Sequence, residues 1–148
     1  MRYRLFRNSI WLSVAVILLV GIPWTDFQNH PHLETVGWVP FVTPPWELGD
    51  SIANVLLYAP FGLSCSLFDR SRRNHWRTFG YATALSLGTE ASQIFSHSRF
   101  ASSTDVVCNM LGTIFGQWAA GVLIATGWRW REPKVQTEES DGSHTPIV

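Results

Sequence analysis

The chain has 148 residues, a formal net charge of zero and a mean hydropathy of +0.06. This length leaves room for one domain of ordinary size, and the balanced charge lacks the overall basic excess that favours nucleic-acid binding. The averages resemble those of a soluble protein, but they conceal an uneven distribution of apolar residues along the chain.

Four apolar runs follow one another, at residues 10–24, 51–68, 78–95 and 106–128. The fourth has no charged residue and is long enough to cross a bilayer, which needs about 20 residues. The first run is short, and the second and third contain the strongly polar Asn54 and Glu90. Each of these three alone is also compatible with a buried helix of a soluble protein.

The positive charges distinguish between the two interpretations. Lysine and arginine resist translocation, so in a membrane protein they collect on alternate connections. Only Arg99 lies between the third and fourth runs, and the other ten of the 11 cations lie on the opposite side: Arg2, Arg4, Arg7, Arg70, Arg72, Arg73, Arg77, Arg129, Arg131 and Lys134. The pattern predicts an all-α polytopic membrane protein, a bundle of four transmembrane helices with both termini cytoplasmic.

The remaining segments differ in composition. The first run is not followed by a cleavage-site pattern, and we interpret it as a retained anchor rather than a signal peptide. Segment 25–49 is rich in proline and tryptophan, and we expect it to lie on the outer membrane surface, with Asp26 as a loop residue of no special role. Residues 132–148 are mainly polar, which predicts a disordered cytoplasmic tail after a membrane domain of residues 1–131. Six tryptophans lie near run ends, as in an aromatic belt: Trp11, Trp24, Trp46, Trp76, Trp128 and Trp130.

Cysteine and histidine spacings predict neither a disulfide nor a metal site. Cys65 lies toward the cytoplasmic end of its run and Cys108 near the outer end of its own, so we expect two buried thiols. His30 and His32 form an H-x-H pair in the outer loop, but they lack a third ligand at a known spacing. We therefore expect no metal and no cofactor.

Polar residues inside the runs carry the functional information. Asp50 and Asn54 are four apart at the outer start of the second run, and Asp105 and Asn109 repeat that spacing in the fourth. A spacing of four places each pair on one helix face, and the repetition suggests a duplicated helical hairpin. The third run carries a continuous polar stripe formed by Thr83, Ser86, Glu90, Gln93 and His97.

Structural roles compete with functional ones for most of these residues. Asp50 and Asp105 could be helix caps, and Asn54 and Asn109 could form hydrogen bonds between helices. Gly112 and Gly116 could form a packing face within the bundle or between two copies of the chain. Glu90 fits a purely structural role less well, since a carboxylate within a span costs roughly 2.5–3.5 kcal/mol on insertion scales. Arg99 is its expected counter-charge.

The combination of these pieces resembles the VanZ-like family of membrane proteins. The matching stretches are DSIAN and YAPFG at residues 50–62, SLGTEASQ at 86–93, and Arg99 with DVVCNMLG at 105–112 and Gly116. The resemblance implies a small polytopic helical protein, whose founding family member is associated with low-level teicoplanin resistance. Family positions map onto Asp50, Asn54, Pro60, Gly62, Glu90, Gln93, Arg99, Asp105, Asn109 and Gly112.

Together these features predict a polar pocket that opens outward. We expect its ligand-binding residues to be Asp50, Asn54, Glu90, Gln93, Arg99, Asp105 and Asn109. We expect structural roles for Pro60, which would kink the second helix, and for Gly62, Gly112 and Gly116, which would admit close neighbours.

Three classes of function remain open. The first is a non-enzymatic envelope protein of a bacterial-type plasma membrane that binds a lipid or amphiphile and lowers glycopeptide susceptibility. The second is an intramembrane enzyme acting on a lipid-linked envelope precursor, although no nucleophile is evident and catalytic residues stay unassigned. The third is a small ion-coupled carrier, which would require a homo-oligomer. Membrane lipids are the expected partners, and nucleic acids are not.

Reporter fusions test the predicted topology. A fusion after Arg131 should report the cytoplasm and one within residues 25–49 the outside, because the arginine-rich segments resist translocation. An outside signal from the C-terminal fusion would mean three or five spans and would contradict the four-span arrangement.

Overall fold

A computed structural model describes residues 2–42 and 48–127 of the chain. The described elements are four α-helices and one short 3-10 helix: α1 (Arg2–Gly21), η1 (Leu33–Thr35), α2 (Leu48–Phe68), α3 (Arg72–Gln93) and α4 (Ser103–Ala125). Two isolated β-bridges join loops, Phe27 with Ser96 and Gly37 with Ser102. The prediction of an all-α fold with four long helices is confirmed.

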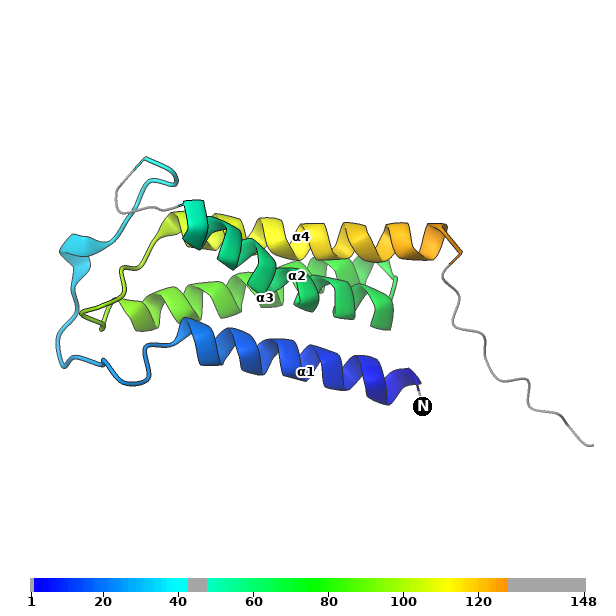
Figure 1. Cartoon of the computed structure of the whole chain (residues 1–148), viewed down its shortest axis with the longest axis horizontal. Helices are drawn as coiled ribbons and strands as arrows, with labels where there is room; N and C mark the ends of the chain where they lie inside the picture. Colours follow the sequence, from blue (N-terminus) through cyan, green and yellow to red (C-terminus); the bar gives the residue numbers. More distant parts are fainter. Residues whose placement is uncertain (1, 43–47, 128–148) are drawn as a thin grey trace, which may run out of the picture.

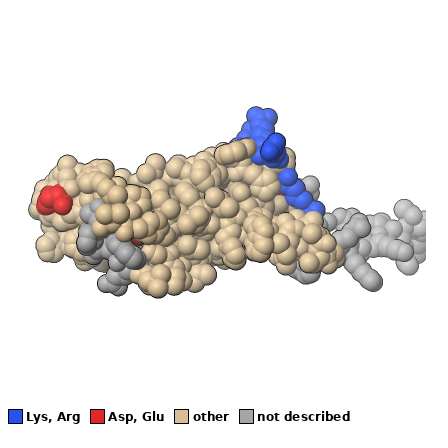
Figure 2. All heavy atoms as spheres, turned by 90° about the horizontal axis from the view of Figure 1, so that it is seen from above, with Lys and Arg blue, Asp and Glu red and all other residues tan. Residues whose placement is uncertain are grey.

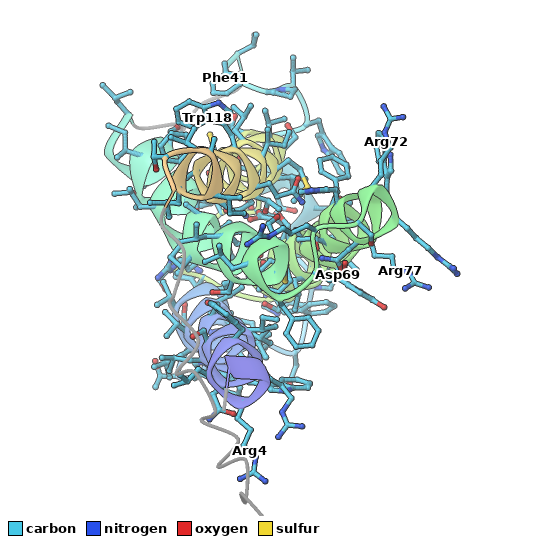
Figure 3. The ribbon with its side chains drawn as sticks, turned by 90° about the vertical axis from the view of Figure 1, so that its right-hand side faces the viewer. Arg4, Phe41, Asp69, Arg72, Arg77 and Trp118 are labelled. Atoms are coloured by element: carbon cyan, nitrogen blue, oxygen red, sulfur yellow. The ribbon has the colours of Figure 1, made fainter. Side chains whose placement is uncertain are left out.

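The helices lie side by side in a bundle in which each helix runs antiparallel to the next (Figure 1). The N-terminus, the α2–α3 connection and the end of α4 share one end, which we call the basic end because Arg4, Arg72 and Arg77 project from it (Figure 3). The loop residues 22–42 and the connection 94–102 share the other end, which we call the loop end. Figure 2 shows arginines gathered toward the basic end and acidic atoms at the loop end.

Three helices are long and apolar enough to cross a membrane, namely α1 over Arg4–Gly21, α2 and α4. The first apolar run, predicted at 10–24, belongs to a 20-residue helix that begins at Arg2, because the preceding arginines favour helix. The third run belongs to α3, which is not among the three candidate spans since its basic start and polar stripe lower its hydropathy. The three apolar helices indicate an integral membrane protein.

The exterior of the bundle is apolar. Large side chains with more than half of their surface exposed occur on all four helices, as at Leu19 of α1, Leu56 of α2, Tyr81 of α3 and Trp118 of α4. Soluble monomers rarely expose so continuous an apolar surface, whereas lipid requires it. The buried apolar cluster is small and consists of Ile17, Tyr58, Phe61, Cys65 and Ala82.

The closest pair of helices is α2 and α4, and three glycines make this possible. A Cβ added to Gly62 would meet the Thr113 backbone, and one added to Gly112 would meet the Val55 carbonyl. A Cβ added to Gly116 would meet the Ala59 carbonyl. These glycines therefore pack within one chain. Gly112 and Gly116 face α2 and not a second copy of the chain.

Pro60 lies inside α2, which continues to Phe68 as one helix. The first turns of α2 run obliquely to the remainder of the helix (Figure 1), as a proline kink produces. Cys65 and Cys108 are both buried free thiols, as predicted. The predicted tail 132–148, the cations after α4 and three of the belt tryptophans (Trp46, Trp128 and Trp130) lie outside the described residues.

Replacing Gly112 with alanine should destabilise the bundle by roughly 1–3 kcal/mol, because the added Cβ would force the α2 and α4 backbones apart. The melting temperature in detergent, followed by tryptophan fluorescence, measures the loss. Gly121→Ala on the same helix is the matched control, since a Cβ there meets open space. Equal melting temperatures for the two variants would contradict the close α2–α4 contact.

Candidate functional site

A cavity of about 500 Å³ lies between the helices at the loop end of the bundle. Three residues of α1, Ile17, Val20 and Gly21, contribute to its wall. All seven residues predicted to bind a ligand line it: Asp50, Asn54, Glu90, Gln93, Arg99, Asp105 and Asn109. The structure therefore brings these residues together, and their role in binding stays a prediction.

The first turns of α2 and α4 supply one wall. Asn54 lies within hydrogen-bonding reach of the Asp105 carboxyl group, and Asp50 is close enough to repel it. The N-cap of α4 is Ser102, whose hydroxyl accepts a hydrogen bond from the Thr104 amide at 3.1 Å. Asp105 is thus not the N-cap that the structural alternative required, and its carboxyl group faces the cavity.

Glu90 is the most buried carboxyl group of the cavity, with 8% of the residue exposed. Its Oε2 accepts a hydrogen bond from the Ser102 backbone amide at 2.7 Å. In a capping box the third helical residue, here Asp105, would accept from that amide, but Glu90 reaches it from α3 instead. Glu90 therefore holds the start of α4 in place and lines the cavity at the same time.

Gln93 and Arg99 lie at the carboxyl end of α1. Gln93 Nε2 donates to the Gly21 carbonyl at 2.9 Å, and Arg99 Nη2 makes a long contact of 3.5 Å with the Val20 carbonyl. Both carbonyls belong to the last turn of a helix, where intrahelical donors are lacking. Within the described part of the chain Arg99 forms no ion pair with Glu90, so the expected direct pairing is absent.

One buried acceptor of the cavity lacks a partner. Asn109 Nδ2 donates to Ser86 Oγ at 2.9 Å, but Asn109 Oδ1 has no hydrogen-bond partner among the described residues. The Tyr58 hydroxyl is buried in the same wall, within reach of the hydroxyls of Ser86 and Thr89. Tyr58 is a cavity residue that the sequence analysis missed, although it follows Asn54 by four residues and so shares its helix face.

A second hollow adjoins the cavity. This groove of about 250 Å³ runs between Trp38 of the loop, Leu87 of α3 and Val106 of α4, and its lining is largely apolar. Glu90 and Ser102 line both the groove and the cavity. The hydrogen bond between them therefore forms part of the wall that separates a polar space from an apolar one.

A family model described as VanZ/LLP1 matches residues 5–124 of the chain. The chain belongs to the VanZ/LLP1 family. The match contains every residue that lines the cavity, so the cavity is part of the family domain. It also confirms the resemblance drawn from the motifs of residues 50–116. No curated protein and no solved structure matches the chain.

In this VanZ/LLP1 domain the loop after α1 is fastened to the α3–α4 connection. Asp26 Oδ2 accepts hydrogen bonds from the Ser98 amide at 2.7 Å, and from Ser96 Oγ and the His97 amide at 3.0 Å each. The hydrogen bonds from Ser98, and then from Ser96 and His97, lower the pKa of Asp26 to about 2. Asp26 therefore has a structural role, which differs from the expectation of an inert loop residue.

Further contacts extend this fastening along the loop. Gly37 donates its amide to the Ala101 carbonyl at 2.9 Å, and the Ser103 amide donates to the Gly37 carbonyl at 2.9 Å. Phe41 donates its amide to Thr104 Oγ1 at 2.9 Å. The loop after α1 thus packs along the residues that start α4, and it supports the rim of the cavity.

The structure adds a third histidine to the H-x-H pair of the VanZ/LLP1 domain. The ring centroids of His30 and His32 are 4.6 Å apart, and those of His32 and His97 are 5.9 Å apart. Among the described residues, no three His, Cys, Asp or Glu side chains are arranged to hold a metal ion. The three rings make aromatic contacts that join the two loops.

Acidification should release the α3–α4 connection from Asp26. Because the pKa is about 2 in the folded protein and ordinarily 3.8, the carboxylate contribution is fully present above pH 3.8 and is lost as the pH falls through about 2. Amide hydrogen exchange at His97 and Ser98, corrected for intrinsic rates, should accelerate over that interval. Asp26→Ala should exchange rapidly at every pH, whereas the control Glu34→Gln should behave as wild type. Unchanged protection in Asp26→Ala would contradict the contact.

Proposed function

We propose that this VanZ/LLP1 protein crosses a bacterial-type plasma membrane four times, with both termini cytoplasmic, and binds the polar part of a lipid or amphiphile in its cavity. The observation that carries the proposal is the cavity itself. Polar side chains from α2, α3, α4 and the α3–α4 connection converge on it, although the outside of the bundle is apolar. One buried acceptor in its wall, Asn109 Oδ1, has no partner among the described residues.

The packing of α3 supports a fourth span. Its 22 residues would extend roughly 33 Å, which is about the thickness of the hydrocarbon core. Ser86, Glu90 and Gln93 of its polar stripe are buried, whereas Tyr81 and Leu87 are more than half exposed. A helix that turns its polar stripe inward and its apolar residues outward suits a position among membrane helices. It begins at Arg72, at the same end of the bundle as the start of α1 (Figure 1).

The composition of the cavity supports an amphiphilic ligand. Its volume falls in the range of about 300–1,000 Å³ that small-molecule sites occupy. Carboxyl, amide and guanidinium groups line it together with the apolar Ile17, Leu57 and Phe100. A ligand with polar and hydrocarbon parts would satisfy both kinds of surface. Sequestering or covering such a ligand at the outer face is the route by which we propose that the protein lowers glycopeptide susceptibility.

Mass spectrometry of the lipids that co-purify with the full chain tests this function. We expect one amphiphile class to be retained well above its share of the membrane. Asp105→Asn and Glu90→Gln should each lower that retention at least about tenfold, since each removes a charged hydrogen-bonding group from the cavity. Both should melt close to wild type, because Ser102 caps α4 without Asp105 and a glutamine oxygen can still accept from the Ser102 amide.

Glu34→Gln is the matched control for these variants. It removes one carboxylate from an exposed side chain of the outer loop that does not line the cavity. Wild-type retention in this control is expected. If Asp105→Asn and Glu90→Gln also retain the ligand, the cavity is not the binding site and a purely structural role is the better account of both residues.

A further inference from the structure

The charged groups of the cavity are unequal in number and in their contacts. Three carboxyl groups, from Asp50, Glu90 and Asp105, share the cavity with one guanidinium, that of Arg99. Glu90 already accepts a hydrogen bond from a backbone amide. Asp105 is partly buried, and the exposed Asp50 of the same cavity lies close enough to repel it. A partly buried carboxylate beside a second carboxylate requires compensation, which a proton or a bound cation can supply.

A buried acceptor without a partner indicates which kind of cation fits. Asn109 lies one helical turn below Asp105, and only 3% of the residue is exposed. Its Oδ1 has no partner among the described residues and can only accept a hydrogen bond. Tyr58, 1% exposed, adds a buried hydroxyl to the same cavity wall, beside the hydroxyls of Ser86 and Thr89. A primary ammonium group carries a positive charge and three N–H donors and no acceptor, so it complements this lining.

Arg99 offers a different kind of contact at the edge of the same cavity. Arg99 is exposed, and the one described hydrogen bond of its guanidinium is the long contact with the Val20 carbonyl at 3.5 Å. Most of its five N–H donors therefore have no partner among the described residues. A planar guanidinium with free donors binds phosphate oxygens in a bidentate manner. The cavity thus combines an acidic pair with a single anion-binding group.

We propose that the cavity holds the headgroup of a phospholipid in which a primary ammonium group is joined to the phosphate by a short linker. The ammonium lies between Asp50 and Asp105, above Asn109, and the phosphate lies at Arg99. This inference rests on the proposed function and specifies its ligand. A free phosphate ester of the same chemistry is the other source of such a group, and the lipid is favoured because Ile17, Leu57 and Phe100 supply an apolar part of the lining.

Native mass spectrometry of the delipidated full chain tests the headgroup. The probes are phosphatidylethanolamine and phosphatidylglycerol with identical acyl chains, which share the phosphate but differ in the ammonium. We expect the ethanolamine lipid to be retained at least about tenfold over the glycerol lipid, equivalent to about 1.4 kcal/mol. Equal retention overturns the ammonium assignment and leaves lipid binding intact. Retention of neither lipid above a nonspecific level overturns the proposed function as well.

Charge-neutral variants test the orientation. Asp50→Asn and Asp105→Asn should each reduce the preference for the ethanolamine lipid toward unity, whereas Arg99→Gln should weaken both lipids by a similar factor and keep the preference. The controls Glu34→Gln and Arg77→Gln remove the same charges outside the cavity, and both should behave as wild type. A preference that survives both aspartate substitutions contradicts the placement of the ammonium.

A soluble competitor distinguishes the two sources of the headgroup. Glycerophosphoethanolamine carries the same polar groups without acyl chains. At a concentration equal to that of the lipid it should not displace it, since the hydrocarbon contributes affinity through apolar burial. Displacement at equal concentration overturns the assignment to a lipid.

Discussion

The close approach of α2 to α4 is the constraint on which the rest of the structure depends. Apolar side chains give little driving force for helix association in lipid, so helices associate where small residues allow the backbones to touch. Gly62, Gly112 and Gly116 supply that contact. Because α2 and α4 run in the same direction, the contact also brings Asp50 to the level of Asp105. The acidic wall of the cavity is a geometric result of glycine packing several turns away.

The residues that line the cavity also complete the ends of the helices around it. The backbone groups that a helix leaves unpaired at its termini need partners from the protein where the helix end is buried. Glu90 accepts from the amide of Ser102, the N-cap of α4, and Gln93 donates to the last carbonyl of α1. A substitution at either position therefore acts on a ligand contact and on a helix end together. Asp50 and Asp105 have a smaller part in completing the helix ends.

The sequence alone was sufficient to predict the features that depend on local spacing. Apolar runs predicted four helices, and pairs four residues apart predicted which side chains share a face, so all seven candidate residues were assigned to one pocket that the structure also contains. Contacts between distant segments were not predictable in this way. Asp26 binds a turn about 70 residues later, and Glu90 binds the amide of Ser102 rather than the side chain of Arg99. Such partners depend on loop geometry, which has no periodic signal.

The wall between the polar cavity and the apolar groove is thin, since Glu90 and Ser102 line both. One hydrogen bond of 2.7 Å thus forms part of the barrier between the polar cavity and the apolar groove. A molecule too long for the cavity would extend into the groove by parting this bond, and Ser102, the N-cap of α4, would then lose the acceptor for its amide. The size of what the protein can enclose is therefore tied to the integrity of one helix start.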